Sequence, residues 1–323
     1  MKDNILELKD LSVKFNTDTG YVYALNNFNL SLKRNQIIGI VGESGSGKSV
    51  SVNAILKLTP EKAEVSGQIL YNSNGNFIDL NKIHRDSKDM RKVRASEISI
   101  IFQEPMSSLS PIHKISQQMT DGLIYNGESW QDAYDRSIDL LSKVGVTSPE
   151  IRMNQYSFEL SGGIKQRIMI AIALLSNPSI LIADEPTTAL DVTIQAQILQ
   201  LIQNLQNENQ MSVLYISHDM SLISNISDLI YVLYDGCLME KGTVYEIIKK
   251  AKHPYTKGLL SSIPKATQKG RLQTIKGSIR GPYDYSNGCP FVDRCDLRID
   301  KCNDTFPTET VSSDTHSFFC HRM

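Results

Sequence analysis

The chain has 323 residues and nearly balanced charges, with 34 lysines and arginines against 35 aspartates and glutamates. At about 150 residues per domain, this length predicts two units, or one large domain with an appendage. The net charge of −1 disfavours a nucleic-acid binder that depends on bulk positive charge, and no apolar stretch approaches the roughly 18 to 20 residues that cross a bilayer. A charged first segment and five cysteines favour a reducing compartment over export. We therefore expect neither a membrane-spanning, nor a secreted, nor a fibrous protein.

Two strands with one polar face are predicted at the start of the chain. Apolar Leu11, Val13 and Phe15 alternate with polar residues, and the pattern returns at Phe28–Leu32 after a polar turn at 16–20. These strands predict an N-terminal antiparallel β subdomain.

Short apolar runs of the kind that parallel strands need when both faces are covered recur along the rest of the chain. They are Ile37–Val41, Ile98–Phe102, Ile180–Ala183, Val213–Ile216 and Leu229–Leu233. Helical patterns lie between several of them, and the clearest runs to Leu205 after a candidate N-cap at Asp191. A turn at Asp235-Gly236 leads into a further short strand at Cys237–Glu240. This alternation predicts an α/β protein with a parallel sheet.

Two changes in composition predict where the chain divides. Helical segments replace the apolar runs at about 104–175, which we expect to form a helical subdomain inserted into a sheet domain of residues 1–250. The remainder, residues 251–323, is rich in Pro, Gly and Cys and poor in apolar residues. This small extension therefore needs a staple in place of a large core.

A glycine-rich loop follows the apolar run Ile37–Val41 and opens a helix. Its residues Gly42-Glu43-Ser44-Gly45-Ser46-Gly47-Lys48-Ser49 match the pattern G-x4-G-K-[ST] at every fixed position. The glycines let backbone N–H groups curl around a phosphate chain, and the helix directs its positive end at the same charge. Lys48 would neutralise β- and γ-phosphate charge, and the Ser49 hydroxyl would ligate Mg²⁺. A chance Gly/Ser-rich loop does not explain the strand–loop–helix context, so we expect the chain to bind a nucleoside triphosphate.

Another of these apolar runs, Ile180–Ala183, is followed directly by two carboxylates. Asp184 at such a strand end reaches the metal, usually through water, and Glu185 polarises an attacking water. Two acids after an apolar run are most often a solvated strand end. The phosphate-binding loop earlier in the chain favours the functional interpretation.

A serine and two glycines open another apolar helix. Ser161, Gly162 and Gly163 leave N–H groups at the helix N-terminus, which makes a second anion site; the alternative is that Ser161 is a simple N-cap. A second anion site fits an arrangement of two chains, in which one subunit's helix end closes on the ATP of the other. In their order and spacing these parts resemble the ATP-binding cassette family, whose signature is LSGGQ, over roughly residues 5–250.

The resemblance implies a P-loop NTPase core and roles for further residues. Gln103 matches the glutamine that touches Mg²⁺ and senses the nucleotide, so that Ser49, Gln103 and Asp184 would form the Mg²⁺ site. Ala189–Asp191 matches the D-loop, through which Asp191 communicates across the dimer. His218 matches the switch histidine that contacts the γ-phosphate.

An aromatic residue stacks on adenine in this family, and Phe15 is the candidate here, with Tyr21 and Tyr23 as alternatives. Phe15 would otherwise be a core residue at the end of an alternating strand. The signature departs from the family at Ile164, where glutamine is usual. Because the Ser-Gly-Gly segment supplies the phosphate contacts and Glu185 is intact, we expect nucleotide closure and hydrolysis to survive.

Two segments resemble the ATPases of oligopeptide, dipeptide and nickel importers. Residues 253–260 resemble the HPYT segment of their C-terminal extension, and residues 103–109 resemble their Q-loop. The resemblance implies a peripheral subunit at the cytoplasmic face of the cell membrane. Its partners would be a second, similar ATPase, two permeases and an extracellular substrate-binding protein. The helical subdomain would offer the groove for the coupling helices of the permeases.

Four cysteines in the tail are spaced C-x5-C-x6-C-x17-C, at Cys289, Cys295, Cys302 and Cys320. Four thiolates suit an iron–sulfur cluster or zinc, and the lack of paired C-x2-C knuckles favours the cluster. A similar tail in the oligopeptide and dipeptide group is associated with a [4Fe–4S] cluster. Free reduced thiols are the alternative to a bound centre that staples the extension. Cys237 is expected to be a buried apolar residue.

These features together favour an ATPase that couples ATP and Mg²⁺ to peptide import. Nickel or metal–chelate import is the alternative within the family, because these ATPases do not touch the substrate. A soluble cassette of DNA repair or of the ribosome is a further alternative. The Lys48–Ser161 segment is too short for the long coiled coil of repair members, and the single P-loop differs from the paired cassettes of translation members. A pure iron–sulfur redox protein would leave the nucleotide machinery without purpose, and no nucleic-acid partner is expected.

Overall fold

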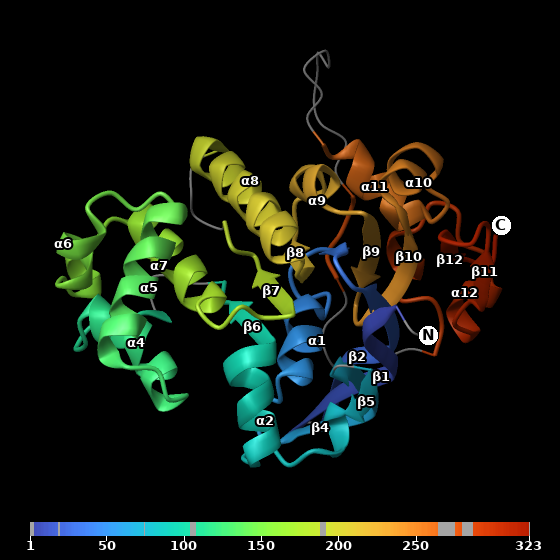
Figure 1. Cartoon of the computed structure of the whole chain (residues 1–323). Coiled ribbons are helices and arrows are strands. Elements are labelled where there is room, and N and C mark those ends of the chain that lie inside the picture. Colours follow the sequence, from blue (N-terminus) through green and yellow to red (C-terminus); the bar gives the residue numbers. More distant parts are fainter. Residues whose placement is uncertain are drawn as a thin grey trace. The chain divides into compact units, whose positions relative to one another are not determined.

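The computed structural model describes residues 3–18, 20–73, 75–103, 108–187, 192–263, 275–279 and 287–322 (Figure 1). The chain divides into two compact units, the first made of residues 1–85 and 215–323 and the second of residues 86–214. Both units combine helices with strands, which confirms the predicted α/β class. Within the described residues, no helix has the length and apolar character needed to cross a membrane.

An antiparallel sheet occupies the N-terminal part of the first unit. Its strand order is β2-β1-β4-β5, and the strands are β1 (Asn4–Thr17), β2 (Gly20–Lys33), β4 (Ala63–Ser73) and β5 (Asn76–Asp79). Leu8 of β1 lies opposite Leu30 of β2 and Ile69 of β4, and all three side chains are buried. The antiparallel subdomain is therefore confirmed, although the sequence pattern does not predict β4 and β5.

A second sheet in this unit contains the strand that leads into the glycine-rich loop. β3 (Ile37–Val41) is buried throughout and pairs in parallel with β9 (Leu229–Tyr234). β10 (Cys237–Thr243) pairs antiparallel with β9, and β12 (Ser317–Phe319) and β11 (Glu309–Val311) continue the sheet beyond β10. The C-terminal extension thus contributes the last two strands at one side of this sheet, with β11 at its edge, and the sequence pattern does not predict them.

The helices of the first unit lie against these sheets. In its described part they are α1 (Lys48–Ile55), α9 (Met220–Ile226), α10 (Val244–Lys250), α11 (Pro254–Ser261) and α12 (Lys301–Asp304), with 3₁₀ turns at Leu80–Lys82 and Val292–Arg294. α9 packs directly on β3, because a Cβ atom at Gly39 would clash with the Ile223 side chain. α1 begins at Lys48, as the glycine-rich pattern predicts.

The second unit carries two parallel strands and a series of helices. β6 (Ile98–Ile101) pairs with β7 (Ile180–Asp184), with Ile100 opposite Ile182. The described helices are α2 (Lys88–Lys92), α4 (Ile115–Tyr125), α5 (Trp130–Lys143), α6 (Pro149–Met153), α7 (Gly162–Leu174) and α8 (Val192–Asn209), with a π turn at Val93–Glu97 and a 3₁₀ turn at Ser157–Glu159. β8 (Ser212–Ser217) spans the division between the units. The helix predicted up to Leu205 is confirmed as α8.

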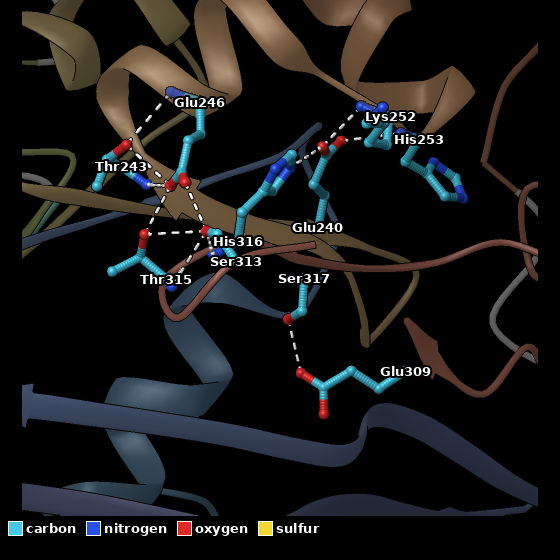
Figure 2. Close-up of polar contacts among 10 residues, drawn as sticks. All are labelled: Glu240, Thr243, Glu246, Lys252, His253, Glu309, Ser313, Thr315, His316 and Ser317. Carbon is cyan, nitrogen blue, oxygen red and sulfur yellow. Dashed lines mark hydrogen bonds and ion pairs between the residues drawn. The ribbon is translucent and has the colours of Figure 1, made fainter. Parts of the chain in front are cut away.

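A buried carboxylate fastens the C-terminal extension to β10. Glu240 is fully buried, and its oxygens accept hydrogen bonds from the backbone N–H groups of Lys252 at 2.7 Å and His253 at 3.0 Å. Its Oε1 also lies 2.8 Å from Nε2 of the buried His316, next to β12 (Figure 2). Polar contacts of this kind hold an extension that has little apolar material of its own.

A second carboxylate, Glu246 on α10, holds the loop before β12. It accepts hydrogen bonds from the backbone and hydroxyl of Thr243, both at 2.9 Å, and from the hydroxyls of Ser313 at 2.6 Å and Thr315 at 2.8 Å (Figure 2). Burial raises the pKa of this carboxyl, but the hydrogen bonds outweigh burial and lower the pKa of Glu246 from 4.5 to about 2. The charged form therefore stabilises the folded state.

Replacing Glu246 with glutamine tests this contact. Because its folded-state pKa is lowered, the carboxylate contributes stability above about pH 4.5 and loses that contribution as the pH falls towards 2. We expect Glu246→Gln to lower the free energy of unfolding by about 1 kcal/mol at pH 7, since solvent screens a partly exposed group. Urea unfolding followed by circular dichroism measures this difference, which should shrink between pH 4.5 and pH 2. An equal loss in the exposed control Glu61→Gln, or a loss independent of pH, contradicts the account.

Candidate nucleotide-binding site

The glycine-rich loop of the first unit joins the end of β3 to the start of α1. A Cβ atom at Gly42 would clash with the carbonyl oxygen of Leu233, and one at Gly47 would clash with that of Ala24. Gly47 also has φ +95°, a left-handed conformation that favours glycine. The backbone path of the loop therefore depends on glycine at these two positions.

Lys48 and Ser46 place polar side-chain groups at the loop. The side chain of Lys48 is buried and folds back over the loop, where its Nζ donates to the carbonyls of Gly42 at 2.8 Å and Glu43 at 3.0 Å. The Ser46 hydroxyl is buried without a hydrogen-bond partner among the described residues. Ser49 is half-buried in the first turn of α1, whose N-cap, Gly47, has no side chain to satisfy the first N–H groups. These groups fit a phosphate chain and a hydroxyl ligand for Mg²⁺.

The remaining loop residues differ in exposure and contacts. Ser44 and Gly45 are exposed, and Gly45 has φ +83°. Glu43 is held by residues from outside the loop: its backbone N–H donates to the Tyr255 hydroxyl, and its carboxylate pairs with Arg294. Sequence reasoning did not find Tyr255 or Arg294 as neighbours of the loop.

Two further predicted residues of the first unit have separate positions. His218 follows β8 and is exposed, next to Asp219, which caps α9 through its side chain. Phe15 is half-buried on β1, opposite Val22 and Ala63. Their assigned roles therefore stay predictions.

The two alternative adenine contacts lie on the neighbouring strand. Tyr21 and Tyr23 on β2 are 46 % and 37 % exposed. The Lys14 ammonium lies 4.4 Å from the ring centre of Tyr21 and so covers part of it. Both tyrosines remain alternatives to Phe15 for stacking on adenine.

The second unit brings Gln103 and Glu185 together. β6 and β7 run in parallel, so the residues that follow them meet at the same edge of the sheet. Asp184 ends β7 and is buried, and Glu185 follows in a left-handed conformation with φ +46°. The Gln103 amide donates to the Glu185 carboxylate at 3.1 Å. A side chain held by such a strained backbone and a donor is typical of a functional site.

The Ser-Gly-Gly segment forms the N-terminus of α7 in the same unit. Ser161 is the N-cap, but its side chain makes no capping hydrogen bond and is exposed, so the simple-cap alternative is not what the structure has. Gly162 and Gly163 face open space, because a Cβ atom on either would meet nothing within 4 Å. The helix end is therefore open to an incoming anion. Ile164, the departure from the family signature, is half-buried.

A residue that sequence reasoning missed ties α7 to the acidic strand end. The buried side chain of Gln166 donates to the carbonyl of Pro186, directly after Glu185. α7 and the acidic end of β7 are thus connected within the second unit. The predicted D-loop, Ala189–Asp191, lies outside the described residues. The next helix, α8, begins directly after it at Val192. The Q-loop residues 104–107 lie outside them as well.

The four tail cysteines converge on one small cavity in the first unit. Cys289, Cys295, Cys302 and Cys320 all line a space of about 20 Å³, beside His253 and Phe291. Burial raises the pKa of the Cys289 thiol to about 12 and raises those of Cys295 and Cys320. The donor type suits a soft metal centre, yet among the described residues no group of three His, Cys, Asp or Glu side chains is arranged to hold a metal ion. Cys237 is buried in β10, as predicted.

Two family models match separate parts of the chain. Residues 25–188 match the model described as ABC transporter. Residues 239–302 match the model described as oligopeptide/dipeptide transporter, C-terminal region.

Curated relatives align with nearly the whole chain. The dipeptide transport ATP-binding protein DppD of Bacillus subtilis is 39 % identical, over 98 % of this chain and 94 % of its own length. The oligopeptide transport ATP-binding protein OppD of the same organism is 42 % identical, over 97 % of this chain and 87 % of its own. DppD of Haemophilus influenzae is 40 % identical, over 94 % of this chain and 91 % of its own.

Solved structures of cassettes share the fold. An ATP-binding cassette solved as a dimer, in a post-hydrolysis state with ADP and Pi, has a TM-score of 0.65 and 28 % identity, over 74 % of this chain and 98 % of that one. The cbiO1 protein of Clostridium perfringens, part of an ABC transporter complex, has a TM-score of 0.63 and 27 % identity, over 76 % of this chain and 90 % of that one. The phosphate-binding loop, the acidic strand end, the family model and the full-length relatives agree: this chain belongs to the ABC transporter family and is an ATP-hydrolysing cassette.

Proposed function

We propose that this chain is the ATP-hydrolysing subunit of a membrane importer of oligopeptides or dipeptides. The observation that carries the proposal is the match of residues 239–302 to the C-terminal region of oligopeptide/dipeptide transporters. Relatives that align with nearly the full chain are named as dipeptide and oligopeptide transport ATP-binding proteins. His253 is the N-cap of α11 and Pro254 its first residue, so the HPYT segment opens this helix.

The phosphates of ATP bind, in this proposal, to the loop 42–49. Lys48 exchanges the carbonyl oxygens it now contacts for β- and γ-phosphate oxygens, which carry more charge. Ser49, Gln103 and Asp184 would hold Mg²⁺, which when bound neutralises phosphate charge. Phe15 would stack on adenine.

Hydrolysis follows from the carboxylate of Glu185. Glu185 orients a water molecule for in-line attack on the γ-phosphate, and the 3.1 Å hydrogen bond from Gln103 fixes the direction of that carboxylate. His218 contacts the γ-phosphate. Ser161, Gly162 and Gly163 of a second cassette close on the nucleotide with their open N–H groups, and Asp191 communicates between the two cassettes.

Exposed apolar side chains support a membrane partner for the second unit. Tyr125, Phe158 and Ile151, from the helical segments after Gln103, are 82 %, 69 % and 60 % exposed. A protein partner that covered these side chains would remove their apolar surface from water. We place the coupling helices of two permeases on these segments, at the cytoplasmic face of the membrane. A second, similar ATPase and an extracellular substrate-binding protein complete the assembly.

We further propose that Cys289, Cys295, Cys302 and Cys320 hold a [4Fe–4S] cluster. The support is that the four thiols line one cavity and that the extension around them needs a staple. The thiols must lose their protons to bind iron, because burial keeps the pKa values of Cys289, Cys295 and Cys320 high without it. The centre would be structural.

Replacing Glu185 with glutamine tests the function. The variant keeps the size and the Gln103 contact of the side chain but loses the charge that polarises water. We expect the assembled transporter to bind ATP with unchanged affinity and to lose ATP hydrolysis by at least about 100-fold. Cells that carry the variant should lose uptake of labelled di- and oligopeptides and keep uptake of nickel.

The outcomes of that experiment separate the alternatives. Loss of nickel uptake alone would assign the chain to metal import. Unchanged uptake of both peptides and nickel would favour the alternative of a soluble cassette with no role in transport. Retained turnover in the assembled complex would remove the role of Glu185 while leaving the nucleotide site in place.

Replacing Cys295 with serine tests the cluster. We expect the purified wild type to contain about four iron atoms and to absorb visible light as a brown protein, and the variant to lose both. Cys237→Ala is the matched control, because this thiol is buried in β10 apart from the cavity lining. Equal iron content in the wild type and Cys295→Ser shows that the four thiols are not the ligands.

A further inference from the structure

A salt bridge links the C-terminal extension to the phosphate-binding loop. Both Nη atoms of Arg294 donate to the Glu43 carboxylate, Nη1 to Oε2 at 2.8 Å and Nη2 to Oε1 at 3.1 Å. Glu43 is the second residue of the loop, and Arg294 directly precedes Cys295 of the tail. Both residues belong to the first unit, so the contact lies within one compact body.

The surroundings of Arg294 fix its guanidinium in this position. The Arg294 side chain is 7 % exposed, and its Nε donates to the carbonyl of Lys276 at 2.8 Å. The group lies 5.6 Å from the ring centre of Tyr234 and 5.9 Å from that of Phe291. A planar fork that is buried and held from three sides recognises a carboxylate with both oxygens.

A second contact from the extension holds the backbone of the same residue. The Glu43 N–H donates to the hydroxyl of Tyr255 at 2.9 Å. Tyr255 is fully buried and packs against Tyr234 and Phe291, with ring centres 4.7 Å and 5.3 Å apart. Side chain and main chain of Glu43 are thus both held by residues beyond 250.

Glu43 in turn sets the position of groups that face the phosphates. Its carbonyl accepts hydrogen bonds from Lys48 Nζ at 3.0 Å and from the Ser46 N–H at 3.1 Å. A displaced Glu43 would therefore move both of them. Its carboxylate is also an anion in a loop that must attract anions, and the paired guanidinium offsets this repulsion.

We propose that Arg294 is a positioning residue of the nucleotide site: by neutralising and fixing Glu43, the C-terminal extension sets the affinity of the loop 42–49 for ATP. This inference rests on the proposed binding of phosphates by that loop. It gives the extension a role in the ATPase cycle besides any metal that its cysteines hold. Loss of the Arg294 side chain leaves an unpaired carboxylate beside the polyphosphate, which weakens ATP binding.

Four variants of the assembled transporter test the proposal through the KM for ATP and kcat. Arg294→Gln should raise KM about tenfold, a size typical of coupling between sites, and change kcat less than twofold. Glu43→Gln combined with Arg294→Gln removes the unpaired charge and should recover most of that loss. Arg294→Lys keeps the charge without the planar guanidinium, so its KM for ATP should lie between those of the wild type and Arg294→Gln. Arg298→Gln, an exposed arginine of the same segment, is the control and should leave KM unchanged.

Three results would overturn the proposal. The first is an unchanged KM for ATP in Arg294→Gln. The second is a KM in the double variant at least as high as that in Arg294→Gln. The third is a fall in kcat as large as the rise in KM. If Arg294→Gln fails to assemble, Arg294→Lys takes its place in the test, because an unchanged KM for ATP in that folded variant would also contradict the proposal. Lys48→Ala keeps the two proposals distinguishable. If this variant retains its affinity for ATP, the assignment of the loop itself is wrong. If Lys48→Ala loses that affinity while Arg294→Gln has an unchanged KM for ATP, only the role of Arg294 is refuted.

Discussion

The path of the backbone between β3 and α1 is the constraint on which the nucleotide site depends. Gly42 and Gly47 pass so close to the carbonyls of Leu233 and Ala24 that neither position has room for a side chain. Those carbonyls belong to β9 and β2, so both sheets of the first unit define the loop. The backbone can follow this path only because both positions are glycines, which have no Cβ atom.

A positive local charge is the second requirement of the loop, and residues far along the chain contribute to it. Lys48 supplies a positive group, but Glu43 places a carboxylate in the same eight-residue segment. Arg294 neutralises that carboxylate from the C-terminal extension, and Tyr255 holds the adjoining backbone. The extension is in turn anchored by Glu240 and His316, so a chain of buried polar contacts runs from the last strands to the phosphate-binding loop.

Local patterns in the sequence predicted much of this arrangement, and long-range pairing explains what they missed. β3, the glycine-rich loop and the acidic end of β7 are contiguous motifs, so each could be recognised without knowing its neighbours. β11 and β12 have three residues each, too few for a periodic pattern, and β5 exposes apolar Phe77 and Ile78. Arg294 lies 251 residues from Glu43, and no local feature marks the pair. Gln166 likewise reaches Pro186 only through the folding of the second unit.

Accumulation of a labelled peptide in liposomes that contain the complete transporter tests the central claim most directly. The account predicts uptake that requires ATP on the side of this subunit, hydrolysis that rises when peptide and binding protein are present, and loss of both in Lys48→Ala. Peptide accumulation that persists in Lys48→Ala, with this chain present in the complex, would contradict the claim that ATP bound at residues 42–49 drives import.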